Sequence, residues 1–198
     1  MGMALVTLVA IVCGLGLLVL FAAGQYNTLV ALRNRYKNSF SQIDRQLKVR
    51  YDLITNLVGG AKDHLENEHE TLDGVTLARN AAYSAGAKAA ANPGDPQATT
   101  NLVAAEARLR DALERFLAMA EANPSLTADR SLSRICTELT SLENTICFAR
   151  EAYNDAVMVY NIRREVFPAN LVARMYNFSA AELFQIEFAE QAAKVSLT

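Results

Sequence analysis

The chain has 198 residues, which leaves room for one membrane segment and one domain of ordinary size. Its formal net charge of -2 argues against binding of nucleic acid by bulk electrostatic attraction, and the absence of Trp with only four Pro argues against a loop-rich or β-rich fold. Long segments rich in Ala, Leu, Glu and Arg favour helix, so we predict an all-α protein.

The N-terminal segment is apolar and uncharged. No charged side chain precedes Arg33, and the stretch from Met3 to Ala23 contains only one polar side chain, that of Thr7. These roughly 21 residues would span about 31 Å as a helix, which matches the hydrocarbon thickness of a bilayer. We therefore predict that residues 1–24 form a single transmembrane anchor.

A cleaved signal peptide is the alternative for this segment, because Ala22-Ala23-Gly24 offers the small residues of a cleavage site. However, no basic region precedes the apolar run, and the run is longer than the usual length of about 7–15 residues. The sequence therefore favours an anchor that stays attached.

Basic residues follow the apolar segment closely and set the expected orientation. Arg33, Arg35 and Lys37 lie just after the segment, whereas no basic side chain precedes it. By the positive-inside rule we predict a single-pass protein of the cell (inner) membrane, with its N-terminus outside and its domain in the cytoplasm. We interpret the three residues as topology determinants, with contact to anionic lipid headgroups as a by-product.

Helical periodicity continues almost without interruption after the anchor. Apolar residues recur every three or four positions from Tyr36 to Leu65, so the first helix should continue directly out of the membrane. We place a break between Asn67 and Glu70, followed by a weaker stripe from Leu72 to Tyr83. Asn92-Pro93-Gly94-Asp95-Pro96 should end the second helix and start the third, with Asp95 as N-cap.

The last long helix carries the strongest pattern in the chain. After Asn123-Pro124-Ser125 closes the third helix, an a/d seam runs from Leu132 to Tyr160, and Phe167-Pro168 ends it. We predict that residues 25–168 form an up-down-up-down four-helix bundle with long first and last helices.

The dipeptide Tyr-Asn occurs twice on this seam, one heptad apart. Tyr153 and Tyr160 should bury their rings, and each buried hydroxyl then needs a hydrogen-bond partner. We expect the neighbouring Asn154 and Asn161 to supply these partners and to fix the register of the helices.

Residues 169–198 form a less regular C-terminal tail. Ser179 and Glu182 are spaced as a capping box, which predicts a short helix after them. Folding of the tail onto the bundle is the default expectation, and an exposed surface for a protein partner is the alternative. The candidate residues of that surface are Phe178, Leu183, Phe184, Ile186 and Phe188.

No pattern typical of catalysis is present. Glu66 and His69 have the Glu-x-x-His spacing of di-iron bundles, but such a site needs a second copy, and the other histidine, His64, lies on the same stretch. The sequence contains neither a Gly-x-Ser-x-Gly motif nor a phosphate-binding loop. We predict no enzymatic activity, no metal and no cofactor.

Many spaced segments resemble the LemA family over nearly the whole chain. In the first half these are Tyr26–Asn34, Gln42–Asp44, Gln46–Lys48, Arg50–Ile54, Asn56–Val58, His69–Leu72 and Ala78–Asn80. In the second half they are Glu138-Leu139, Glu143-Asn144, Ile146, Ala149-Arg150, Tyr153-Asn154, Val157, Tyr160-Asn161 and Phe167-Pro168. Thr55 stands where such proteins often have proline, and Asn177 where they often have glycine.

The resemblance implies a short outer N-terminal tail, one membrane helix and a cytoplasmic helical bundle without known enzymatic activity. Members are often linked to membrane metalloproteases of the heat-shock type, to envelope stress and to magnetosome membranes. We interpret the chain as a membrane-anchored scaffold or adaptor that binds protein partners or itself. Two alternatives remain open: a protein that shapes or binds the lipid surface, and a metal-dependent bundle enzyme.

Overall fold

The computed structural model describes residues 2–62 and 69–185, and every regular element in these two ranges is a helix. The six helices are α1 (Gly2–Ala61), α2 (His69–Ala91), α3 (Pro96–Ala122), α4 (Pro124–Thr127), α5 (Arg130–Glu165) and α6 (Ala169–Met175). The predicted all-α fold is confirmed for the described part of the chain.

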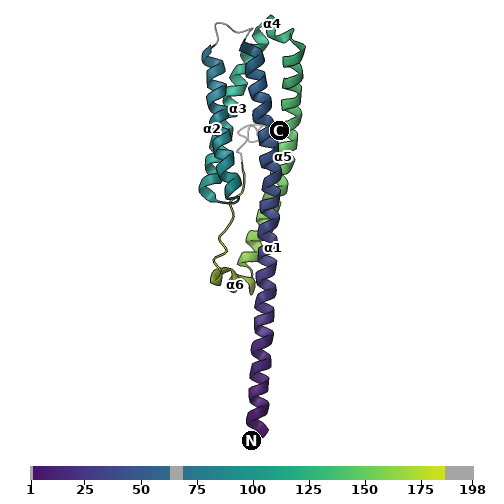
Figure 1. Cartoon of the computed structure of the whole chain (residues 1–198), viewed down its shortest axis with the longest axis vertical. Coiled ribbons are helices and arrows are strands. Elements are labelled where there is room, and N and C mark those ends of the chain that lie inside the picture. Colours follow the sequence, from purple (N-terminus) through teal and green to yellow (C-terminus); the bar gives the residue numbers. More distant parts are fainter. Residues whose placement is uncertain (1, 63–68, 186–198) are drawn as a thin grey trace, which may run out of the picture.

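Helix α1 is a single helix of 60 residues, so its axis is roughly 90 Å long. Its first part extends away from the other helices (Figure 1). The apolar side chains of this part are exposed. This part is long and apolar enough to cross a membrane. Its second part belongs to the helical domain, so the helix does continue from the apolar segment without a break, as predicted.

The core of the domain follows the predicted apolar stripes. Helix α1 packs against α5 and α2, and α2 packs against α3 (Figure 1). On α1 every described member of the predicted stripe is buried, from Tyr36 to Ala61. On α5 the stripe is buried from Leu142 onward, apart from the half-buried Ala149, whereas Ile135 and Leu139 are only half-buried. The N-terminal half of α5 is therefore less completely covered than the rest.

Local capping explains where the helices begin. The Asp95 carboxylate accepts a hydrogen bond from the Ala98 amide at 2.8 Å, and Pro96 takes the first helical position, as predicted. Helix α5 begins at Arg130, two residues before its apolar seam, because Asp129 caps the amides of Ser131 and Leu132. Residues 63–68, where part of the expected break falls, lie outside the described residues.

The C-terminal region differs from the prediction. Its short helix is α6, and residues 178–185, which we call the tail segment, contain no helix. Asn177 ends α6 with a φ of 54°, while the Phe178 amide donates to the Ala173 carbonyl at 2.9 Å. This is a Schellman-type helix end, in which the left-handed residue is usually glycine and sometimes asparagine. The capping box predicted at Ser179 does not form.

Candidate partner-binding groove

The space between α3 and α5 is filled by the tail segment along one part of its length and is an open groove along the other. Nearest the apolar end of α1, the tail segment runs between the helices (Figure 1). Farther from that end, α3 and α5 are separated by an open groove. The predicted closure of an up-down-up-down four-helix bundle therefore stays a prediction.

Two asparagines of α5 hold the backbone of the tail segment. Asn161 accepts a hydrogen bond from the Ala181 amide at 3.0 Å and donates to the Ala181 carbonyl at 2.9 Å. Asn154 makes the same pair of bonds with Phe184, at 2.8 Å and 3.2 Å. Each carboxamide thus pairs with both the amide and the carbonyl of one tail residue, as a neighbouring β-strand would do for an extended chain.

The two seam tyrosines add a second pair of bonds. The Tyr160 hydroxyl donates to the Ser179 carbonyl, and the Tyr153 hydroxyl donates to the Glu182 carbonyl, both at 2.8 Å. We expected the asparagines to be the partners of these hydroxyls, and that expectation is wrong. The tail backbone is the partner of both residue types.

The axial repeat of α5 matches that of the extended tail segment, which explains why residues one heptad apart on α5 bind tail residues three positions apart. One heptad of α5 rises about 10.5 Å, and three extended residues advance about 10 Å. Asn161 and Asn154 are one heptad apart and bind Ala181 and Phe184, which are three residues apart. The seam therefore holds an antiparallel extended chain in one register.

The turn between α2 and α3 fixes the other side of the tail segment. The Glu182 amide donates to the Gly94 carbonyl at 2.9 Å. Gly94 has a φ of 87°, and a Cβ on this residue would lie only 2.9 Å from the Cβ of Ala181. Glycine is therefore required here both by the backbone conformation and by the close approach of the tail.

This arrangement corrects part of the predicted partner surface. Phe178 and Phe184 are buried, and the guanidinium carbon of Arg150 lies 5.5 Å from the centre of the Phe184 ring. Leu183 is half-buried, and Ile186 and Phe188 lie outside the described residues. The Phe178 ring packs against Tyr26 of α1, and Phe184 is held by Asn154 of α5, so both rings belong to the core rather than to an exposed surface.

We expect removal of one asparagine to loosen the tail segment without unfolding the domain. Asn161→Ala leaves the Ala181 amide and carbonyl without their partner, at a cost of about 1–3 kcal/mol. Hydrogen exchange of residues 179–185 should then accelerate. Asn144→Ala, at an exposed position of the same helix, is the control; equal exchange in both variants would contradict the assigned role.

A buried charged layer lies between the tail segment and the groove. Arg50 of α1 pairs with Glu106 of α3 at 2.9 Å and with Glu143 of α5 at 3.4 Å. The Tyr51 hydroxyl donates to the other carboxylate oxygen of Glu106. The layer therefore ties together the three helices that surround the groove.

Burial dominates the electrostatics of this layer. It raises the pKa of Glu106 above the ordinary value of 4.5, although the nearby Arg50 acts in the opposite direction. Burial and the Glu106 carboxylate together raise the pKa of Tyr51, and burial lowers the pKa of Arg150. Arg50, Glu106 and Tyr51 are held by one another, which is typical of a structural ion cluster.

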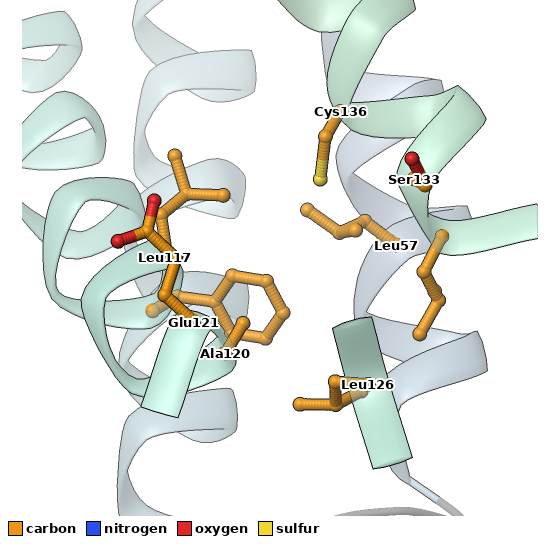
Figure 2. A pocket seen from close by; sticks show the side chains of 9 residues that line it. Leu57, Leu117, Ala120, Glu121, Leu126, Ser133 and Cys136 are labelled. Atoms are coloured by element: carbon orange, nitrogen blue, oxygen red, sulfur yellow. The ribbon is translucent and has the colours of Figure 1, made fainter. Parts of the chain in front are cut away.

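The groove itself is apolar. Leu57 of α1 and Cys136 of α5 lie side by side and face Leu117 of α3 across the groove, and Leu126 of α4 lies at its end (Figure 2). Two adjoining hollows of about 260 and 330 Å³ make up the groove. Their apolar lining residues are Leu57, Leu113, Phe116, Leu117, Ala120, Leu126, Leu132, Cys136 and Leu139. The half-buried seam residue Leu139 is thus part of its wall.

Polar side chains border the groove on both walls. They are Arg110, Glu114 and Glu121 of α3 and Ser133, Thr140 and Glu143 of α5. Burial raises the pKa of the Cys136 thiol, which disfavours the reactive thiolate. An apolar floor with a mixed-charge rim suits the binding of a polypeptide segment. Sequence periodicity could not reveal this groove, because the same apolar pattern also predicts a closed core.

Among the described residues, the predicted juxtamembrane basic residues and the candidate metal ligands do not line the groove. Arg33 lies with its guanidinium carbon 5.1 Å from the centre of the Phe178 ring, whereas Arg35 and Lys37 are exposed. In the part of the chain that the structure describes, no three His, Cys, Asp or Glu side chains gather in a way that could hold a metal ion. His64 and Glu66 lie outside that part.

The profile of the LemA family matches residues 39–197. Magnetosome proteins MamQ 1 and MamQ 2 of Paramagnetospirillum magneticum are each 26% identical over 176 residues, covering 81% of this chain and 65% of the relative. Magnetosome protein MamQ of Magnetospirillum gryphiswaldense is 23% identical over 175 residues, covering 81% and 64%. The chain thus spans a little less than two thirds of the length of these relatives.

Proposed function

The chain belongs to the LemA family, and we propose from this premise that it is a non-catalytic, membrane-anchored adaptor. In this proposal an extended segment of a protein partner binds in the groove between α3 and α5. The apolar start of α1 and the magnetosome relatives support a membrane protein. The basic residues after the apolar segment favour an inner-membrane location with the domain in the cytoplasm.

One observation carries the proposal: the same pair of helices already binds an extended chain. The tail segment lies between α3 and α5: its backbone is held by α5, and its residues Glu182, Leu183 and Gln185 line a hollow together with α3. The groove has the same two walls and Leu57 of α1 as its floor. An extended partner segment could therefore place alternate apolar side chains on that floor.

The partner should be apolar on one side and polar on the other. Each Leu-sized side chain buried on the floor would contribute about 1.5–3 kcal/mol before ordering costs. Charged rim residues of both signs, such as Arg110 and Glu143, would set the orientation of the segment rather than most of its affinity. The family resemblance makes a membrane metalloprotease of the heat-shock type the first partner to test.

Cys136 offers a direct test, because it lines the groove. A variant with Cys13→Ala and Cys147→Ala keeps Cys136 as its single thiol, which can carry a benzophenone crosslinker in intact membranes. We expect light-induced adducts with one protein partner, mapped by mass spectrometry to a short apolar segment. The matched control keeps Cys147 instead, because this residue lies on the same helix but does not line the groove.

A charge in the groove should remove the adduct. Leu117 is 37% exposed, so Leu117→Glu is expected to fold while placing a carboxylate beside the apolar floor. We expect at least about a tenfold loss of crosslinking, because about 1.4 kcal/mol of lost affinity suffices for it. Adducts only within one chain, or only with a second copy, would contradict binding of a protein partner here.

A further inference from the structure

Apolar side chains are exposed at the end of the domain that lies nearest the apolar part of α1. Phe167, Leu171 and Met175 are 73%, 56% and 74% exposed, and Tyr176 is exposed beside them. The opposite side of α6 is buried, through Ala169, Val172 and Ala173. These four exposed residues, which we call the interfacial patch, therefore project from α6 and from the residues just before and after it.

The patch lies at the level where α1 leaves its apolar segment. Arg163 donates to the Gln25 side chain at 2.6 Å, and the rings of Tyr26 and Tyr176 have centroids 4.9 Å apart. Even Ala22, within the apolar segment, packs against the domain core. Gln25 is only about 3 Å along the helix from Ala23, and the headgroup region of each leaflet is about 5–8 Å thick. The patch is thus level with the headgroup region of a membrane that α1 crosses.

The charge around the patch is mainly positive. Arg164 and Arg174 line one hollow of about 440 Å³ together with Asn170, Asn177 and Ser179. Glu165 lines the same hollow and pairs with Arg164 at 2.8 Å. Arg174 is exposed, and the Arg33 guanidinium carbon of α1 lies 5.1 Å from the centre of the ring of Phe178, two residues after Tyr176. Arginines beside exposed apolar side chains are typical of surfaces that bind anionic lipid.

We propose that the interfacial patch inserts into the surface of the same bilayer that α1 crosses. Phe167, Leu171 and Met175 would enter the boundary between headgroups and acyl chains, and Arg174 would lie against anionic phospholipid headgroups. Helix α6 would thus be a second membrane contact, which fixes the domain against rotation and tilt. This inference rests on the membrane anchoring proposed above but not on the binding of a partner in the groove.

The absence of Trp from the chain makes a clean fluorescence test possible. Full-length Phe167→Trp is placed in nanodiscs of phosphatidylglycerol and phosphatidylcholine that contain lipids brominated near the top of the acyl chain. We expect a blue-shifted emission and at least about twofold stronger quenching than for Phe148→Trp. Phe148 is the matched control, because it is 70% exposed and lies about 25 Å along α5 from the end of that helix nearest the patch.

A third variant separates failure of the anchor from failure of the patch. Val12→Trp lies in the apolar part of α1 and should be quenched whenever α1 is in the bilayer. Quenching at position 12 without extra quenching at position 167 would overturn the proposal. No quenching at position 12 would overturn the membrane anchoring, and with it the premise of the patch.

The role of the arginine is tested in the same system. Arg174→Glu in the Phe167→Trp background should reduce the quenching by about half or more in anionic discs, while Arg134→Glu at the far end of α5 should not. Equal quenching with and without phosphatidylglycerol, and no effect of Arg174→Glu, would overturn the headgroup contact.

Discussion

Phe184→Ala is expected to lower the free energy of unfolding by about 3–5 kcal/mol, the usual cost of removing a fully buried aromatic ring. Phe184 is 0% exposed, and its ring lies beside the Arg150 guanidinium. Its backbone is also held at both polar atoms by Asn154. The cavity would therefore form where the tail segment joins α5, and the rigid asparagine contacts would limit collapse around it.

Urea or thermal unfolding of the full chain in detergent micelles, followed by circular dichroism, measures this loss. Phe148→Ala is the matched control, because it removes the same ring from a site that is 70% exposed and should cost less than about 0.5 kcal/mol. If both variants were equally stable, the tail segment would not be part of the cooperative core.

Glu106→Ala is expected to cost a similar amount, about 3–5 kcal/mol, because it leaves a buried cation without its main partner. Glu106 is 2% exposed, and Arg50 is buried beside it. The control is Glu143→Ala, whose carboxylate also contacts Arg50 but is about half exposed, so its loss should cost at most about 1 kcal/mol. Equal costs would show that the inner pair has no special role.

The same pair predicts an unusual pH dependence. Because the pKa of Glu106 is raised in the folded state, the folded protein binds more protons than the unfolded chain between about pH 4.5 and that raised pKa. The contribution of Glu106 to stability therefore falls as pH rises through this window and is constant above it. Comparing the melting temperature of wild type with that of Glu106→Gln across the window isolates the effect; a parallel pH dependence would contradict it.

Local signals predicted the helices well. The apolar run before Arg33, the period of three and four on α1 and the Asp95-Pro96 start of α3 each depend on neighbouring residues in the chain. The helices that these signals predict could therefore be identified without knowledge of tertiary contacts. The buried stripe from Tyr36 to Ala61 follows for the same reason, because one face of a long helix must be covered.

The tail could not be predicted in this way, because its partners are distant in sequence. Ser179 and Glu182 have the spacing of a capping box, but two hydrogen bonds hold the backbone extended: the Tyr160 hydroxyl donates to the Ser179 carbonyl, and the Glu182 amide donates to the Gly94 carbonyl. The heptad spacing of the two Tyr-Asn pairs was the available signal for the tail contact. Packing between helices needs few polar side chains, so four polar side chains on one seam indicate another hydrogen-bonding partner. The groove left no such clue, since Leu57 and Leu139 would also suit a closed core.

In the proposed membrane-anchored arrangement, the unbroken course of α1 would make the position of the domain sensitive to bilayer thickness. Leu57 lies 34 residues beyond Ala23, so the groove floor is roughly 51 Å from the end of the apolar segment. An apolar helix that is longer than the local hydrocarbon layer relieves the mismatch by tilting, and a tilt of about 10° would move a rigid lever of this length sideways by roughly 9 Å at Leu57. A thin or thick membrane would therefore present the groove to a neighbouring membrane protein at different positions, unless the contact made by α6 resists the tilt.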